Sequence, residues 1–378
     1  MKQIYLDYNA TTPVSSYALE AMLPFLKQHY GNPSSNHAVG RVGHEAVELA
    51  RGEVAFAIGA TADEVCFSSG GTESNNMAIH GVMLQHAPDS GAHLIVSNFE
   101  HPAVSAPVEY LQRMGYQITE VPCDENGVVT AQRVAEAIRD TTVLVSIMHS
   151  NNEIGTLQPI SKISEVCREQ NVLLHTDAAQ SVGKVSTQVD EIGVDLMTIA
   201  GHKVYAPKGV GALYVRTGVS LDPVLYGAGH ERGLRPGTEN VPSIVGLGKA
   251  MKLAHRSLEE SSERLGNLRD RLSDRLLAGL GTQALIHGEQ APRLPGTLSL
   301  VFPGVRATDL LARVPEICAS TGSACHETGS GMSKTLAALG TNPQDAQGTV
   351  RLTVGWYTSE EDVDCAASSL LSAWESLV

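Results

Sequence analysis

The chain has 378 residues, of which 42% are hydrophobic and 4% are aromatic, so it can bury a large and mostly aliphatic core. Its formal net charge of −14 argues against a general nucleic-acid or anionic-membrane surface, although a basic protein partner stays compatible with it. It has no signal peptide, no apolar run of about 18 residues and no zinc-type cysteine spacing. We therefore expect a cytoplasmic protein with free thiols and no metal site.

Helical and strand-like segments alternate through the first two thirds of the chain. Helical patterns cover Ser15–Lys27 and Glu45–Ile58, and the turn signal Gly31-Asn32-Pro33 lies between them. The strand-like runs are Val65–Phe67, His93–Ser97, Gln117–Val121, Val143–Met148, Val172–His175, Asp195–Ile199 and Val210–Val215. Several runs are continuously apolar, as in strands that are covered on both faces. The pattern predicts an α/β fold, a mostly parallel sheet with helices on both sides.

The pattern of residue types changes after about Gly246. Lys249–Leu280 is a long, charged, amphipathic stretch that predicts a helix leading into a second domain. Strand-like runs at Thr297–Phe302 and Thr349–Val354 belong to that domain. We expect a large domain over residues 15–250 and a smaller α+β domain made of residues 1–14 and 251–378.

A glycine-rich loop joins the first strand-like run to a helix that starts at about Thr72. Its sequence is Ser68-Ser69-Gly70-Gly71-Thr72-Glu73-Ser74, which is neither a dinucleotide nor a nucleoside-triphosphate motif. Free N–H groups at a helix start favour a phosphate, and the Thr72 hydroxyl adds a donor. A plain turn explains the same composition.

Two charged residues follow apolar strands and are expected at the carboxyl end of the sheet, where ligands bind in α/β folds. Asp177 could pair with a protonated pyridine nitrogen, or it could cap a helix. Lys203 could form a Schiff base with an aldehyde cofactor. Lys208 is a rival by position, and an ordinary exposed lysine is the simpler interpretation of either.

Cys325 lies in a loop of small and polar residues, which suits a reactive thiol that must be accessible. Cys66 lies in an apolar strand and is interpreted as core, and Cys167 and Cys365 lie in helical patterns that favour packing. Cys318 precedes the loop and fits either role.

His101 and Arg351 are further candidates. His101 follows a predicted strand and could stack on a flat ring or move protons, although helix starts also favour such a residue. Arg351 lies within a strand-like run and could bind a carboxylate or form a structural ion pair.

An ordered series of motifs covers nearly the whole chain and resembles the cysteine desulfurase family, in the class V aminotransferase group of pyridoxal-phosphate enzymes. The motifs span residues 5–13, 31–35, 70–76, 151–155, 175–180, 201–203 and 235–240. The resemblance implies a fold-type-I transferase with a seven-stranded, mostly parallel sheet. It also implies the family branch with a long mobile cysteine loop.

The resemblance assigns roles to individual residues. Lys203 would bind pyridoxal 5'-phosphate covalently, with further cofactor contacts from Gly71, Thr72, His101, Asn152, Asp177, Gln180 and His202. Thr238 would reach the cofactor phosphate of a partner subunit, which implies a homodimer. Asn152 and Arg351 would hold the carboxylate of L-cysteine.

The implied reaction converts L-cysteine to L-alanine. Lys203 would take the Cα proton, His101 would move protons, and Cys325 would receive the sulfur as a persulfide for an acceptor protein. Acceptors in iron–sulfur assembly, transfer-RNA thiolation and sulfur modification of DNA all fit.

Two features depart from the usual pattern. Ala200 stands where many family members have a serine that bonds the phosphate, a loss worth roughly 1 kcal/mol. His326 follows Cys325, which resembles selenocysteine lyases and keeps that activity as the alternative. A non-catalytic scaffold for a sulfur-transfer complex and an ordinary aminotransferase are further alternatives, which the residues Lys203, His101 and Cys325 disfavour.

Overall fold

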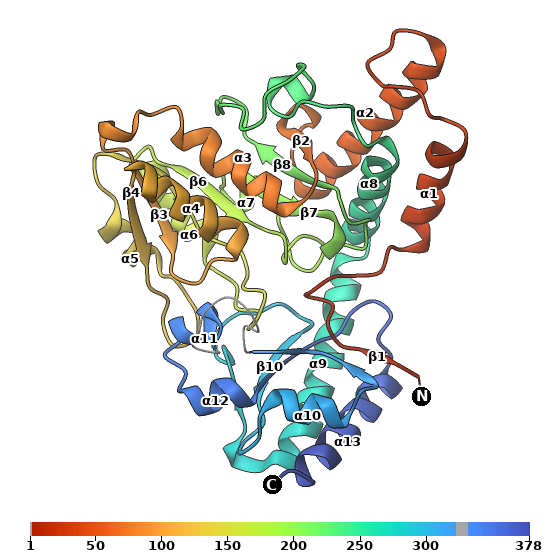
Figure 1. Ribbon diagram of the computed structural model, residues 1–378, viewed down its shortest axis with the longest axis vertical. Helices are drawn as coiled ribbons and strands as arrows, with labels where there is room; N and C mark the ends of the chain where they lie inside the picture. The colour runs from red at the N-terminus through yellow and green to blue at the C-terminus, as the bar shows by residue number, and fades with distance from the viewer. Residues whose placement is uncertain (1, 323–331) are drawn as a thin grey trace.

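The computed structural model describes residues 2–322 and 332–378, and a seven-stranded sheet forms the centre of its larger part (Figure 1). The strand order is β2-β8-β7-β6-β5-β3-β4, and β8 alone runs antiparallel to its neighbours. The strands are β2 (Val65–Ser68), β3 (His93–Ser97), β4 (Gln117–Val121), β5 (Thr142–Ser146), β6 (Leu173–Asp177), β7 (Leu196–Ala200) and β8 (Gly211–Val215). The predicted mostly parallel sheet is confirmed.

Helices cover both faces of this sheet, which explains why β3 and β7 are buried along their whole length. One apolar core joins the sheet to α2, α5, α6 and α8, and a second core joins the other face to α3 and α4. The helices of the larger part are α1 (Ser16–Lys27), α2 (Ala38–Ile58), α3 (Gly71–Met83), α4 (Pro102–Met114), α5 (Ala131–Ala137), α6 (Ile160–Glu169), α7 (Val189–Ile192) and α8 (Val241–Arg256).

The smaller part has its own apolar core and a four-stranded antiparallel sheet in the order β12-β13-β10-β9. Its strands are β9 (Leu285–Ile286), β10 (Thr297–Val301), β12 (Ser320–Thr321) and β13 (Thr349–Thr353), and β1 (Ile4–Tyr5) pairs with β11 (Ile317–Cys318). Its helices are α9 (Leu258–Leu280), α10 (Ala307–Arg313), α11 (Lys334–Ala338), α12 (Pro343–Gly348) and α13 (Glu360–Glu375). Short 3-10 turns are η1 (Ala62–Glu64), η2 (Pro88–Ser90), η3 (Gly201–Lys203), η4 (Glu231–Gly233) and η5 (Gly281–Gln283).

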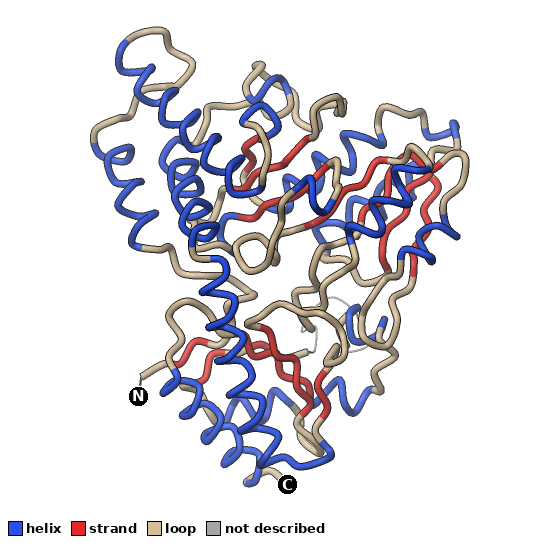
Figure 2. The backbone as a smooth tube through the Cα atoms, turned by 180° about the vertical axis from the view of Figure 1, so that it is seen from behind, coloured by secondary structure: helices blue, strands red, loops and turns tan. Residues whose placement is uncertain are grey.

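Helices α8 and α9 run one after the other from the larger part into the smaller part (Figures 1 and 2). The prediction of one helix over residues 249–280 is wrong, because the helix breaks at Ser257. The Ser257 hydroxyl donates to the Leu253 carbonyl oxygen at 3.0 Å, and such a side-chain bond competes with the helical ladder. The domain boundaries near residues 14 and 250 stay predictions.

The N-terminal segment connects the two sheets. It starts in β1 beside the smaller sheet, and the Thr12 N–H then donates to the His202 carbonyl oxygen at 2.9 Å. The Tyr205 N–H donates to the Thr12 hydroxyl at 2.9 Å. This places residues 9 and 10 at the carboxyl end of β7, directly before the site. Among the described residues, no helix is long and apolar enough to cross a membrane.

Candidate active site

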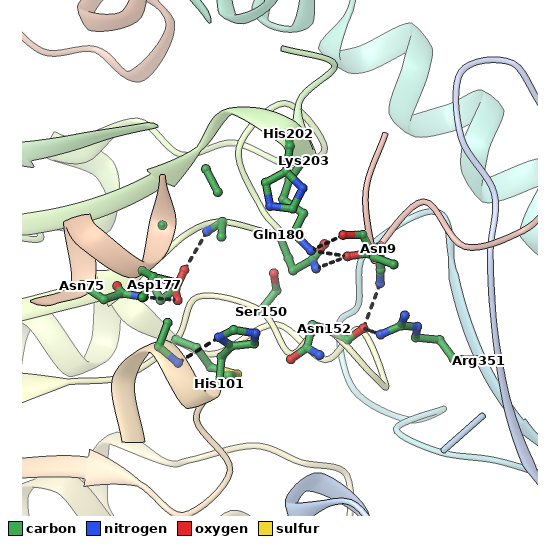
Figure 3. Close-up of a pocket in the computed structure, with 17 residues that line it drawn as sticks. Asn9, Asn75, His101, Ser150, Asn152, Asp177, Gln180, His202, Lys203 and Arg351 are labelled. Carbon is green, nitrogen blue, oxygen red and sulfur yellow. Dashed lines mark hydrogen bonds between the residues drawn. The ribbon is translucent and has the colours of Figure 1, made fainter. Parts of the chain in front are cut away.

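A cavity of about 370 Å³ lies at the carboxyl ends of β6 and β7 (Figure 3). Ligand sites of α/β sheets are found at this edge, and the volume suits a small cofactor. Nine of the residues predicted to bind cofactor or substrate line it. They are Gly71, Thr72, His101, Asn152, Asp177, Gln180, His202, Lys203 and Arg351.

Lys203 lies at the end of the short turn that follows β7. Its ammonium group donates to the carbonyl oxygens of Asn9 at 2.6 Å and Ala10 at 2.8 Å. Burial lowers the pKa of Lys203 to about 8, and the positive charge of Arg351 acts in the same direction. A lysine with a lowered pKa offers more of the neutral amine that attacks an aldehyde.

The turn that carries Lys203 is held in a strained backbone conformation. Tyr205 has a φ of 63°, in the left-handed region that side chains other than glycine rarely adopt. Its ring stacks on Trp356 with the ring centroids 3.9 Å apart, and its hydroxyl accepts the Trp356 N–H at 2.7 Å. Contacts from the smaller part therefore fix the position of Lys203.

Asp177 ends β6 and is 7% exposed. Its Oδ2 accepts from the Asn75 side chain at 2.7 Å, and its Oδ1 accepts from the Ala179 N–H at 2.9 Å. Two donors of fixed position orient the carboxylate toward the cavity that it lines (Figure 3). It does not cap a long helix, because only turns follow β6.

The start of α3 forms the edge of the cavity that suits a phosphate group. Gly71 begins the helix and Thr72 follows it, so their N–H groups have no acceptor in an earlier helical turn. A Cβ on Gly71 would lie 3.3 Å from the Ala200 Cβ, so a side chain at this position would crowd Ala200. Burial and the Lys203 charge lower the pKa of His202 to about 4, which keeps this cavity-lining imidazole neutral at pH 7.

His101 is both a helix cap and a lining residue. Its Nδ1 accepts from the Ala103 N–H at 3.1 Å at the start of α4, while the ring lines the cavity. This bond occupies Nδ1, so proton transfer by His101 would use Nε2. The two interpretations of His101 from the sequence are therefore compatible.

Arg351 both forms an ion pair and lines the cavity. Its guanidinium donates to Asp7 Oδ1 at 2.7 Å and to the Asn152 carbonyl oxygen at 3.2 Å. The Ser320 hydroxyl donates to the other oxygen of Asp7 at 2.9 Å. The structural ion pair is present, and it holds Arg351 at the cavity, where its Nε has no partner among the described residues.

The remaining predicted residues are not among those described as lining the cavity. Thr238 is exposed and does not line the cavity. Cys325 and His326 lie outside the described residues. Cys66 is buried as predicted, whereas Cys365 is exposed, so its interpretation as a packing residue is wrong. An amphipathic helix such as α13 has a solvent face, and Cys365 lies on it.

Asn9, Asn75 and Ser150 also line the cavity, although their residue types and positions predicted no role for them. Asn9 and Asn75 fall within the motifs that carry the family resemblance, and this could have identified them as site residues. Their functions depend on contacts with Lys203 and Asp177, more than 100 residues away in each case.

Glu100, directly before His101, is a buried carboxyl group with an unusual environment. Its Oε1 accepts from the Ser97 hydroxyl and, at 2.9 Å, from the Met148 N–H. Its Oε2 has no partner among the described residues. Burial raises the pKa of Glu100 to about 8, and the negative charge of Asp177 acts in the same direction. Glu100 is therefore protonated at neutral pH.

We expect Glu100 to make the protein less stable in alkali. The folded-state pKa of about 8 exceeds the ordinary value of 4.5. The contribution of Glu100 to the free energy of unfolding is therefore complete below about pH 4.5 and is lost as the pH rises through 8. Glu100→Gln should remove this pH dependence from the urea-unfolding free energy, while the exposed control Glu120→Gln should keep it. Identical pH profiles for Glu100→Gln and the wild type would contradict the assignment.

Comparisons with known proteins identify the family. The model of the aminotransferase class-V family matches residues 4–365. The chain is 43% identical to a protein named cysteine desulfurase IscS from Dictyoglomus turgidum, over 96% of this chain and 92% of that protein. This chain belongs to the cysteine desulfurase family. The predictions of family, of a pyridoxal-phosphate enzyme and of cysteine desulfurase activity are confirmed.

Two solved structures confirm the fold type at the level of the whole chain. One, described as a NifS-like protein, is 35% identical, covers 99% of this chain and 100% of its own, and gives a TM-score of 0.92. Another, described as SspA in complex with cysteine, is 34% identical over 94% of this chain and 99% of its own, with a TM-score of 0.83. The fold-type-I transferase architecture is therefore shared with members of this family.

The residues in the cavity fit pyridoxal phosphate. Lys203 supplies an amine with a lowered pKa, the fixed carboxylate of Asp177 suits a pyridinium nitrogen, and the start of α3 suits a phosphate. The orphan Nε of Arg351 leaves a donor for a carboxylate.

Proposed function

We propose that this enzyme converts L-cysteine to L-alanine and carries the released sulfur on Cys325 as a persulfide. The observation that carries the proposal is the convergence of Lys203, Asp177 and His101 on one cavity, in a chain of the cysteine desulfurase family. When bound, pyridoxal phosphate supplies an electron sink for the carbon atoms of the substrate.

Binding and orientation fall to residues at the edges of the cavity. Arg351 and Asn152 would hold the substrate carboxylate, with Asp7 and Ser320 keeping the Arg351 guanidinium in place. Lys203, Asp177 and Gln180 would hold the cofactor. Thr72, His202 and the backbone at Gly71 would hold its phosphate, without a hydroxyl from Ala200.

Proton transfer falls to Lys203 and His101. Lys203, released from the cofactor, would take the proton from the substrate Cα, which its lowered pKa favours. The Nε2 of His101 would move the protons of the thiol and of the product carbon.

Sulfur transfer would form one bond at Cys325 and break one bond of the substrate. The Cys325 thiolate attacks the substrate sulfur, a new S–S bond forms, and the substrate C–S bond breaks. The electron pair of that bond stays with the carbon, which gains a proton and becomes the methyl group of alanine. The persulfide then passes its outer sulfur to an acceptor protein.

We also propose a cytoplasmic homodimer in which Thr238 reaches the cofactor phosphate of the second copy. The exposed position of Thr238 away from its own cavity supports this proposal. The cysteines of the described residues are free, which fits a reducing compartment.

Turnover measurements on two amino acids test the proposed activity. The cofactor-loaded enzyme, given L-cysteine and a thiol reductant, should release alanine and sulfide in equal amounts. L-selenocysteine in a parallel reaction should give no large advantage in kcat/KM. A strong preference for selenocysteine would favour the lyase instead, and the absence of alanine in both reactions would refute the enzyme.

A further inference from the structure

A second lysine, Lys184, lies beside the cofactor cavity without lining it. It is half-buried in the turn that follows β6, and its ammonium group donates to Gln180 Oε1 at 2.8 Å and to Asn9 Oδ1 at 3.3 Å. It has no ion pair with a carboxylate within the part of the chain that the structure describes. An ammonium group that is partly removed from water and lacks an acidic partner is costly, so its hydrogen bonds to Gln180 and Asn9 matter for its position.

The backbone places Lys184 on the same side of this turn as Gln180. The N–H groups of Lys184 and Val185 both donate to the Ser181 carbonyl oxygen, at 2.9 and 3.0 Å, which closes the segment into a tight turn. The hydrogen bond between their side chains shows that Lys184 and Gln180 lie on one side of this turn. Gly183 has a φ of 74°, and a Cβ there would lie 2.7 Å from the Val204 side chain. The turn therefore packs directly against the residue that follows Lys203.

The chemistry of the ammonium group fixes the polarity of the Gln180 amide. An ammonium group has only donors, so the amide atom that faces Lys184 must be the oxygen. The Gln180 Nε2 then lies on the opposite side, where it donates to the Asn9 carbonyl oxygen at 2.8 Å. Lys203 donates to the same carbonyl oxygen, so the Gln180 amide nitrogen and the Lys203 amine lie next to each other (Figure 3).

We propose that Lys184 is a positioning residue that fixes the Gln180 amide with its N–H groups toward the cofactor, which rests on the proposed function. In this orientation Gln180 offers a donor, and never an acceptor, to an oxygen of the bound cofactor. That donor stabilises the anionic form of the oxygen beside the carbon that Lys203 binds. Without Lys184, only the Asn9 carbonyl oxygen holds the amide in this orientation.

The charged groups around Lys184 are few. Burial lowers the pKa of Lys184 to about 7, and the positive charges of Lys203 and Arg351 add to this effect. The negative charges of Asp177 and Asp7 lie on the side of Lys203. Only the ammonium form lacks an acceptor, so it is this form that holds the Gln180 amide with its oxygen toward Lys184.

The test follows the pH midpoint of the visible absorption band of the cofactor-loaded enzyme, which needs no turnover. Lys184→Met should raise this midpoint by about 1 pH unit or more, because a donor to the anionic oxygen is lost. Lys184→Arg should restore a midpoint close to that of the wild type. Lys208→Met, which removes an exposed lysine near the same turn, is the matched control and should leave it unchanged.

A double-variant comparison separates positioning from a direct charge effect. Lys184→Met should add no further shift in a Gln180→Ala background, because its effect passes through that amide. An unchanged midpoint in Lys184→Met, or an equal shift in both backgrounds, would overturn the proposal. An enzyme that binds the cofactor but makes no alanine would refute the proposed function. The pH midpoint of its absorption band could still be measured, so the two outcomes are distinguishable.

Discussion

Lys203→Ala should lower kcat for alanine formation from cysteine by about 10²- to 10⁴-fold, the range that a positioned acid–base group contributes. The variant loses both the covalent attachment of the cofactor and the base that faces the substrate Cα. No other lysine lines the cavity within the described residues. Lys184, whose ammonium group donates to Gln180 and Asn9, does not line the cavity.

Two measurements check this result. The first is alanine formation, and the second is borohydride reduction followed by mass spectrometry of the peptide that carries the cofactor. The matched control is Lys208→Ala, which removes the rival lysine on the exposed side of the turn and should retain full activity. Cofactor attached to Lys208 or Lys184 in the wild-type enzyme would show that the assignment of Lys203 is wrong.

Cys325→Ala should reduce sulfide and alanine release from cysteine to the level of a reaction without enzyme. The cysteine lies outside the described residues, and the prediction depends on the sequence context and on the family. The visible band of the bound cofactor should persist, because Lys203, Asp177 and Gln180 are untouched. Loss of turnover with an intact cofactor band is the signature of a missing sulfur acceptor.

Cys318→Ala is the control for this variant. Cys318 lies in β11, half-buried and pairing with Tyr5, so its thiol is structural in position. This variant should keep the activity of the wild type. If Cys318→Ala lost the activity and Cys325→Ala kept it, the nucleophile would be Cys318.

Residues that follow apolar strands were the easiest to predict from the sequence. Asp177 and Lys203 come directly after such runs, and the carboxyl ends of neighbouring strands meet at one edge of the sheet. Local patterns also placed Cys66 in the core. The roles of these residues came from the ordered motifs of the resemblance, because residue type and position alone left a helix cap and an exposed lysine open.

Features that depend on long-range contacts were not predicted. The pairing of Asn75 with Asp177, and the Glu100 carboxyl oxygen that has no partner among the described residues, arise only when segments far apart in the chain come together. The break at Ser257 is a departure of one residue from helical φ and ψ within a continuous helical pattern. The role of Thr238 requires a second copy of the chain, and it stays a prediction.

The most direct test of the account is mass spectrometry of the Cys325 peptide after a single turnover with L-cysteine. The experiment omits reductant and acceptor, so the transferred sulfur stays on the enzyme. We predict that this peptide gains one sulfur atom, in an amount equal to the alanine formed. Alanine formation with an unmodified Cys325, or with the added sulfur on another cysteine, would contradict the account.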